Sequence, residues 1–232
     1  MLEHEWDQKS VQFPLDENSI VLDIGVYKGR WSKEIAARYG CKIYAFDPQA
    51  WVVELARKEL VEFKDVVVYD HGLGVESGYF EMEEFETDGA TFMLGRSQRQ
   101  QSGTGYLIEM ADWLSVNHIE GIDLIMMNIE GYEFKLIPYM IEHGIMQKVK
   151  YFMVQFHPYG YDQDDEYLKI RKQMAEIMDI HFDYGIVLVC WKAKEKDARS
   201  DMVDAVVYAA KQAQGQEGEA PKKPARKTRK KA

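Results

Sequence analysis

The stretch from Ile20 to Pro48 reads IVLDIGVYKGRWSKEIAARYGCKIYAFDP. An apolar run leads into a turn with Gly25 and Gly29, then a helical segment, then a second apolar run that ends in Asp47. A strand, a glycine turn, a helix and a strand with an acidic end are typical of units that bind an adenosine-containing cofactor at the carboxyl ends of their strands. The stretch therefore predicts an α/β fold and the position of a cofactor site.

The spacing of the two glycines indicates which cofactor fits. A dinucleotide turn has the spacing G-x-G-x-x-G, which leaves room for a pyrophosphate at the helix N-terminus. Here the spacing is G-x-x-x-G, and Val26, Tyr27 and Lys28 crowd that room. Because S-adenosylmethionine has no phosphates, it tolerates such a turn, and we predict it as the cofactor. A nicotinamide cofactor and a nucleotide-free α/β unit are the alternatives.

The predicted cofactor contacts lie in the glycine turn and beside it. Asp47 comes 22 residues after Gly25, near the spacing at which a carboxylate accepts hydrogen bonds from ribose hydroxyls; capping of the next helix is the alternative. Gly25 and Gly29 are expected to shape the turn around the methionine part. Asp23 is expected to orient the turn near the methionine ammonium, or to brace the turn. At the next strand end, Asp70 or His71 is expected to reach adenine or to meet solvent.

Strands alternate with helices along the chain, which predicts a doubly wound, Rossmann-like, mostly parallel sheet in a single domain. Right-handed crossovers bring the carboxyl ends of the strands to one edge, where ligands bind in such sheets. That edge includes Asn128, Glu130 and His157. The expected strands are 20–25, 42–46, 66–69, 106–110, 122–129, 149–156 and 185–191, and the expected helices are 30–39, 49–60, 111–117, 132–143 and 163–179.

Two segments depart from this alternation. Gly72 to Met82 predicts a hairpin around Glu76, Ser77 and Gly78. Arg96 to Gly105 contains no apolar residue, which predicts a mobile loop or lid.

The composition is that of a globular protein, with 46% hydrophobic residues and two cysteines in 232 residues. The absence of an apolar run near 18 residues and of a signal peptide predicts a cytoplasmic protein without a membrane span. We expect a lead-in at 1–19, the domain at 20–211 and a disordered basic tail at 212–232. The tail carries seven Lys and Arg against two Glu in a chain of net charge −10. It is either simply solvated or binds a polyanion, and the acidic body disfavours nucleic acid as the substrate.

Four stretches resemble the FkbM-type methyltransferases, a class of S-adenosylmethionine-dependent O-methyltransferases. They are LDIGVYKGRWS at 22–32, IYAFDP at 43–48, DLIMMNIEGYE at 123–133 and VQFHP at 154–158. The resemblance implies a class I methyltransferase sheet and methyl transfer to a hydroxyl of a glycan or small secondary metabolite. The family commonly has Lys-Ile-Asp where this chain has Met126, Met127 and Asn128, and often an acid in place of Gln155. Both changes remove charge, so a catalytically silent binding module is the alternative function.

Removal of the acceptor proton by a general base assists methyl transfer to an alcohol. His157 is the expected base because imidazole titrates at about 6.5, and the uncharged Gln155 should leave it largely neutral at pH 7. Glu130 is the alternative base, or it holds the acceptor or orients His157. Each residue also has a purely structural alternative: His157 could be hydrogen-bonded to the backbone, and Glu130 could cap the following helix. Glu130, Asn128 and His157 could converge on a metal, but with Asn128 in place of Asp no metal is expected.

Overall fold

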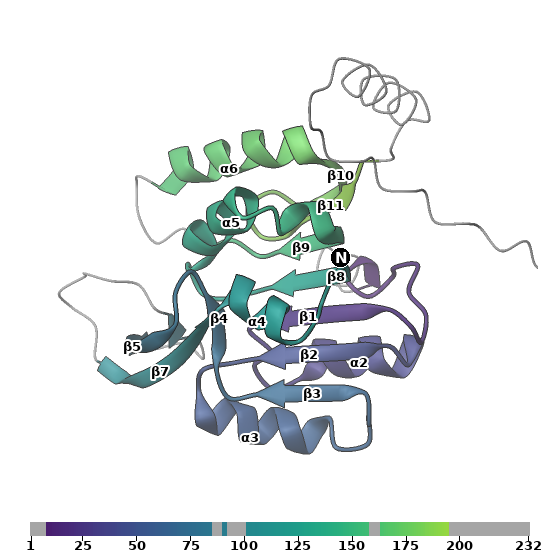
Figure 1. The fold of residues 1–232 in the computed structure, drawn as a ribbon, viewed down its shortest axis with the longest axis vertical. Coiled ribbons are helices and arrows are strands. Elements are labelled where there is room, and N and C mark those ends of the chain that lie inside the picture. The colour runs from purple at the N-terminus through teal and green to yellow at the C-terminus, as the bar shows by residue number, and fades with distance from the viewer. Residues whose placement is uncertain (1–7, 85–89, 92–100, 158–162, 195–232) are drawn as a thin grey trace, which may run out of the picture. The chain divides into compact units, whose positions relative to one another are not determined.

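The structure, a computed structural model, describes residues 8–84, 90–91, 101–157 and 163–194 (Figure 1). All of these except Lys194 belong to one compact unit, Met1–Ala193. The predicted tail at 212–232 lies outside the described residues, so the domain boundaries stay predictions. Within the described residues, no helix combines the length and the apolar character needed to cross a membrane.

Seven strands form the large sheet, in the order β10-β11-β9-β8-β1-β2-β3. Neighbouring strands are parallel except at β11, which is antiparallel to both β9 and β10. The chain passes from β1 to β2 on one side and resumes at β8 on the other, so the topological switch point lies between β1 and β8. The predicted doubly wound α/β fold is confirmed. The strands are β1 (Ile20–Ile24), β2 (Lys42–Phe46), β3 (Val66–Tyr69), β8 (Ile122–Met127), β9 (Val149–Val154), β10 (Met178–Asp183) and β11 (Val189–Ala193).

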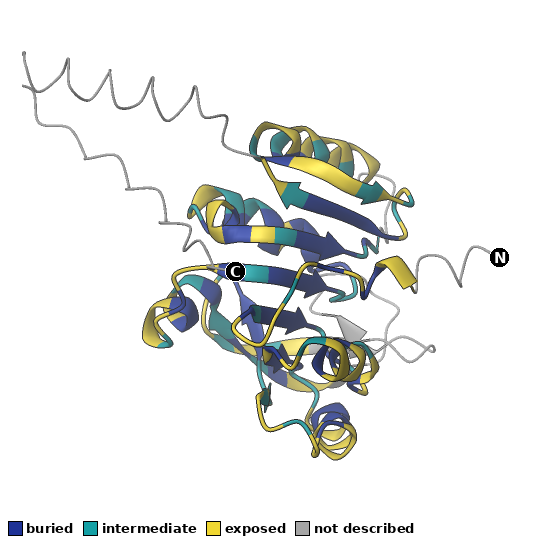
Figure 2. Ribbon diagram, turned by 90° about the vertical axis from the view of Figure 1, so that its right-hand side faces the viewer, coloured by how far each residue is buried: buried dark blue, intermediate teal, exposed yellow. Residues whose placement is uncertain are grey.

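Helices cover both faces of this sheet, and alternate residues of β1 show the two layers. Val21 packs in one core with α2 (Arg30–Tyr39) and α3 (Ala50–Glu59), whereas Leu22 packs in a second core with α4 (Met110–Val116), α5 (Glu133–Glu142) and α6 (Gln163–Ile177). A short 3-10 helix, Met146–Lys148, precedes β9. Figure 2 shows buried strands between helices whose outer surfaces are exposed.

The segment before β1 packs against the α2 side of the sheet. Val11 and Phe13 are buried in the same core as Ile35 of α2. The indole nitrogen of Trp31 donates to the Ser10 carbonyl at 2.8 Å. Residues 8–13 therefore cover part of α2 and of the sheet.

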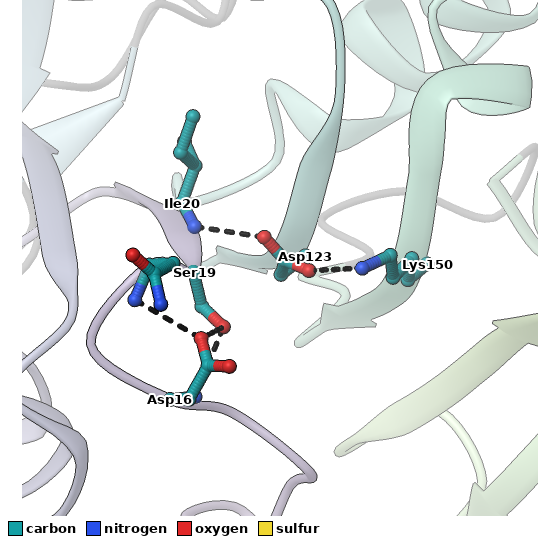
Figure 3. A network of polar contacts seen from close by, with 6 residues as sticks. Asp16, Ser19, Ile20, Asp123 and Lys150 are labelled. Atoms are coloured by element: carbon teal, nitrogen blue, oxygen red, sulfur yellow. Dashed lines mark hydrogen bonds and ion pairs between the residues drawn. The ribbon is translucent and has the colours of Figure 1, made fainter. Parts of the chain in front are cut away.

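A polar network joins three strands at their amino ends (Figure 3). The carboxylate of Asp123 in β8 accepts a hydrogen bond from the backbone of Ile20 in β1 at 2.8 Å, and the Lys150 ammonium of β9 donates to it at 2.5 Å. The Asp16 carboxylate accepts the Ser19 hydroxyl at 3.1 Å beside it. This network lies at the end of the strands opposite to the predicted site.

A second, smaller sheet has the order β4-β7-β5-β6 and corrects two expectations. Its strands are β4 (Gly72–Gly74), β5 (Gly78–Glu84), β6 (Ala90–Thr91) and β7 (Gln101–Glu109). The predicted hairpin at 72–82 is wrong, because β7 lies between β4 and β5 and pairs with both. The predicted loop is wrong over residues 101–105, which belong to β7; residues 96–100 lie outside the described part. The strand β10 was also not predicted: its first two residues were assigned to the end of the preceding helix, and 180–183 to no element.

Candidate functional site

The ends of β1 and β8 approach each other closely at Gly25. The backbone N–H of Asn128 donates to the Ile24 carbonyl at 2.9 Å, and that of Gly25 donates to the Phe46 carbonyl at 2.9 Å. Gly25 has φ +93°, and a Cβ built there would lie 1.9 Å from the Asn128 carbonyl oxygen. A side chain is therefore excluded by the backbone of the neighbouring strand end, at the switch point of the sheet.

A cavity of about 730 Å³ opens at this switch point. It brings together three predicted site residues, Asp23, Gly25 and Asn128. The rest of its wall, which was not predicted to belong to the site, comes from the turn, α2, the strand ends and the segment before β1. These further lining residues include Tyr27, Lys28, Arg30, Trp31, Gln155 and Ser10. The cavity thus carries both carboxylate and cationic side chains.

Asp23 is the buried acid of the cavity wall. Its side chain points to the α2 face of the sheet, where the Ser32 hydroxyl donates to Oδ2 at 2.5 Å, and the residue is 2% exposed. Burial raises the pKa of Asp23 to about 7; the Ser32 hydrogen bond lowers it and the charge of Asp47 raises it further. Asp23 is therefore partly protonated at neutral pH in the absence of a cation beside it.

This raised pKa predicts a pH-dependent stability. Asp23 binds its proton more tightly in the folded protein than in the unfolded chain. Its ionisation therefore makes the free energy of unfolding fall as pH rises from about 4 to about 7, by up to roughly 1.4 kcal/mol per pH unit. Urea denaturation at pH 5 and pH 7 should show that Asp23→Asn gains stability relative to the wild type as pH rises. Asp183→Asn is the control, because the Arg171 hydrogen bond lowers the pKa of Asp183 and its contribution is lost only at more acidic pH. If the free energy of unfolding changes with pH in the same way in the wild type and in Asp23→Asn, the raised pKa of Asp23 is contradicted.

Asp47 lies beside the cavity wall but does not line it. It is 5% exposed, and its two oxygens accept the backbone N–H groups of Tyr27 at 3.2 Å and Gln49 at 3.0 Å. Burial raises its pKa to about 6, against the lowering effect of the hydrogen bonds from Gln49 and Tyr27. Asp47 therefore ties the glycine turn, in which Tyr27 has φ +48°, to the start of α3. Each of its oxygens keeps further lone pairs for a ligand.

The other predicted cofactor residues lie outside the cavity lining. Gly29 precedes α2 with φ +81°, and a Cβ there would lie 3.0 Å from Leu60, so its role is the contact between α2 and the end of α3. Asp70 is exposed after β3. The His71 ring packs 5.1 Å from that of Tyr69, burial lowers its pKa, and its buried Nε2 has no hydrogen-bond partner among the described residues.

Glu130 and His157 lie together just beyond the ends of β8 and β9, outside the cavity lining. His157 Nε2 is 3.6 Å from a Glu130 oxygen, and His157 Nδ1 is 3.0 Å from Oε1 of Glu133, whose side chain is fully buried. Glu133 was not predicted. The signal in the sequence was an acid in the first turn of a helix, three residues after Glu130 (EGYE). Asn128 and Gln155 of the cavity wall directly follow β8 and β9, two residues before Glu130 and His157, so at most about 7 Å of chain separates wall and cluster.

The charges around His157 correct one expectation. Burial lowers the pKa of His157, but the hydrogen bond and charge of Glu133 and the charge of Glu130 together outweigh it, so the pKa is raised. The expectation, based on the uncharged Gln155, that no neighbouring charge raises the pKa of His157 is wrong, because Glu130 after β8 and Glu133 at the start of α5 both raise it. Burial raises the pKa of Glu133, against the lowering effect of His157. In the described part of the chain, no three His, Cys, Asp or Glu side chains are grouped to hold a metal.

No protein-family model matches this chain, and no curated protein sequence does. Solved structures match it at low identity. A proposed rRNA methylase from Clostridium thermocellum aligns over 84% of this chain and 97% of its own, with 13% identity and a TM-score of 0.53. A proposed methyltransferase from Streptococcus mutans in complex with SAH aligns over 82% and 97%, with 15% identity and a TM-score of 0.50. The chain has the class I methyltransferase fold. Its strand order and its antiparallel β11 agree with that fold.

Proposed function

We propose that this protein is an S-adenosylmethionine-dependent O-methyltransferase that acts on a hydroxyl of a glycan or small secondary metabolite. The observation that carries the proposal is the cavity at the β1–β8 switch point, because ligands of doubly wound sheets bind there. The fold and the resemblance of four sequence stretches to FkbM-type methyltransferases support the cofactor. The acceptor class rests on that resemblance, and the acidic body is a reason against nucleic acid.

The side chains of the cavity suit the amino-acid part of S-adenosylmethionine, which carries an ammonium and a carboxylate. Asp23 would accept hydrogen bonds from the ammonium, and Lys28 or Arg30 would meet the carboxylate. Two buried oxygens of lining residues, Tyr27 Oη and Asn128 Oδ1, have no hydrogen-bond partner among the described residues. Buried polar atoms normally have partners, so these two support a polar ligand. Asp47 would use its remaining lone pairs for the ribose hydroxyls.

When bound, S-adenosylmethionine supplies an electrophilic methyl group on a sulfonium. The chain's own residues must then place the acceptor hydroxyl and take its proton. His157 is the proposed base, and Glu130, 26% exposed at its side chain, would hold the acceptor or stabilise the protonated ring. The half-buried Asn128 and Gln155, which lie between cavity and cluster, are uncharged, so the negative charge around His157 comes from Glu130 and Glu133.

Thermal unfolding with four ligands tests the cofactor. S-adenosylmethionine and S-adenosylhomocysteine should raise the melting temperature, because a ligand at 100 times its dissociation constant stabilises the folded state by about 2.7 kcal/mol. NAD and NADP should leave it unchanged. A rise with the nicotinamide cofactors alone would overturn the proposal. Incubation with methyl-labelled S-adenosylmethionine and a panel of glycans and small hydroxylated metabolites then tests methyl transfer. Cofactor binding without transfer to any acceptor would favour the alternative function, a catalytically silent binding module.

A further inference from the structure

We infer that Glu133 is the positioning residue of the acceptor side, holding the Glu130 turn and the His157 ring so that the lone pair of the neutral ring is on Nε2. The catalytic purpose of this positioning rests on the proposed function, but the evidence for the positioning itself is the geometry of three side chains. Glu130 lies in the connection between β8 and α5, Glu133 is the first residue of α5, and His157 follows β9; Figure 1 shows these elements.

The carboxylate of Glu133 lies in the protein interior and its hydrogen bonds explain why it is there. Its Oε1 accepts from the backbone N–H of Ile129 at 3.0 Å, and its Oε2 accepts from that of Gly131 at 2.7 Å. His157 Nδ1 is the third partner, 3.0 Å from Oε1. A buried carboxylate is strongly disfavoured unless such donors surround it, so the three bonds together allow the ionised form. Its place in the first turn of α5 favours negative charge as well.

The two backbone bonds hold Glu130 in an uncommon conformation. Glu130 has φ +53° and Gly131 has φ +98°, and the left-handed region is rarely occupied by residues other than glycine, asparagine and aspartate. The residues before and after Glu130 both donate to the Glu133 carboxylate, so this one side chain fixes the Glu130 backbone from both sides. Strained backbone of this kind persists only where the surroundings determine it, and it occurs frequently at functional sites.

The third bond determines the tautomer of His157. A carboxylate accepts and cannot donate when ionised, so His157 Nδ1 must carry the hydrogen that lies toward Glu133. In the neutral ring the lone pair is then on Nε2. That atom lies 3.6 Å from Glu130, which is too far for a direct hydrogen bond but close enough to stabilise the ring once it is protonated. A carboxylate that orients an imidazole and stabilises its cation is the arrangement found in the Ser-His-Asp triad, where the histidine is the general base.

The tautomer of the wild-type protein tests this directly. Long-range proton–nitrogen correlation spectra of the full-length, nitrogen-15-labelled protein, with His157 identified by its loss in His157→Gln, should show the neutral ring protonated at Nδ1. A neutral ring protonated at Nε2 would overturn the inference, because the Glu133 carboxylate would then face a lone pair. The experiment needs neither cofactor nor acceptor. A protein that fails to bind S-adenosylmethionine yet shows the Nδ1–H tautomer would therefore refute the proposed function and leave the Glu133–His157 pair intact.

A charge-removing variant supplies the second test. Glu133→Gln should shift the neutral His157 ring toward the Nε2–H tautomer and lower the pH at which this histidine titrates, because the stabilising negative charge is lost. Glu142→Gln, an exposed glutamate at the other end of α5, is the matched control and should change neither. His181 on β10 should titrate identically in all three proteins. If the tautomer and the titration of His157 are unchanged in Glu133→Gln, the inference is contradicted. If this variant does not fold, the tautomer of His157 in the wild-type protein still tests the inference.

Discussion

Replacing Gly25 with alanine should destabilise the domain by at least about 3 kcal/mol. The left-handed backbone conformation alone costs an alanine roughly 1–2 kcal/mol. In addition, the new methyl group would lie 1.9 Å from the Asn128 carbonyl oxygen, so the ends of β1 and β8 would have to separate. Backbone atoms cannot move aside as a flexible side chain can, and the hydrogen bond from Asn128 to Ile24 would be lost with that movement. Urea denaturation measures the difference in the free energy of unfolding.

Gly40 offers a matched control for this variant. It also has a left-handed conformation, with φ +60°, but a Cβ built there meets no atom within 4 Å. Gly40→Ala should therefore show only the conformational cost, about 1 kcal/mol. Equal destabilisation by the two alanines would mean that the close approach of the strand ends does not constrain residue 25.

The second large effect concerns turnover once an acceptor is known. His157→Ala should lower kcat by about 10² to 10⁴, the usual contribution of a general base, with cofactor affinity nearly unchanged. Because the pKa of His157 is raised by Glu133 and Glu130 against the lowering effect of burial, wild-type turnover should rise with pH through a value above the ordinary pKa of about 6.5. This pH dependence should disappear in His157→Ala.

Two comparisons make the result specific. His181→Ala removes a histidine from β10, away from the cluster, and should leave turnover unchanged. Glu130→Gln should act mainly on the KM for the acceptor. Near wild-type turnover of His157→Ala would mean that Glu130 is the base or that positioning of the reactants alone carries the reaction.

The parts of the fold that could be predicted are those in which local pattern and tertiary structure agree. The Gly25 turn, α2 and the alternation of faces along β1 follow from glycine positions and apolar periodicity. Strand β10 was missed because Ile170, Met174 and Ile177 continue a helical spacing up to its first residue, while Ile180 within it is 51% exposed. Its pairing with β11 is a tertiary contact that no local pattern records.

The same limit explains the errors in the small sheet. Gly72–Met82 looks like a hairpin locally, but β7 supplies the partner for both of its strands from about 30 residues later. Gly103 and Thr104 are exposed, so their part of β7 has no apolar alternation to reveal it. At the site, Asp23 and Asn128 could be placed because they end adjacent strands. Glu133 could not be placed at the site from the sequence, since only the folded chain shows that its carboxylate, at the start of a helix, is fully buried and bonded to His157.

The proposed function requires that the cavity beside Asp23 bind the amino-acid part of S-adenosylmethionine. Calorimetric titration with S-adenosylhomocysteine at about pH 7, in two buffers of different ionisation enthalpy, tests it most directly. An ammonium beside Asp23 favours the ionised carboxylate, so binding to the wild type should release protons and the measured enthalpy should depend on the buffer. Asp23→Asn should abolish that dependence and weaken binding by roughly 1.5–3 kcal/mol, while Asp183→Asn should match the wild type. Wild-type affinity together with an unchanged buffer dependence in Asp23→Asn would contradict the claim.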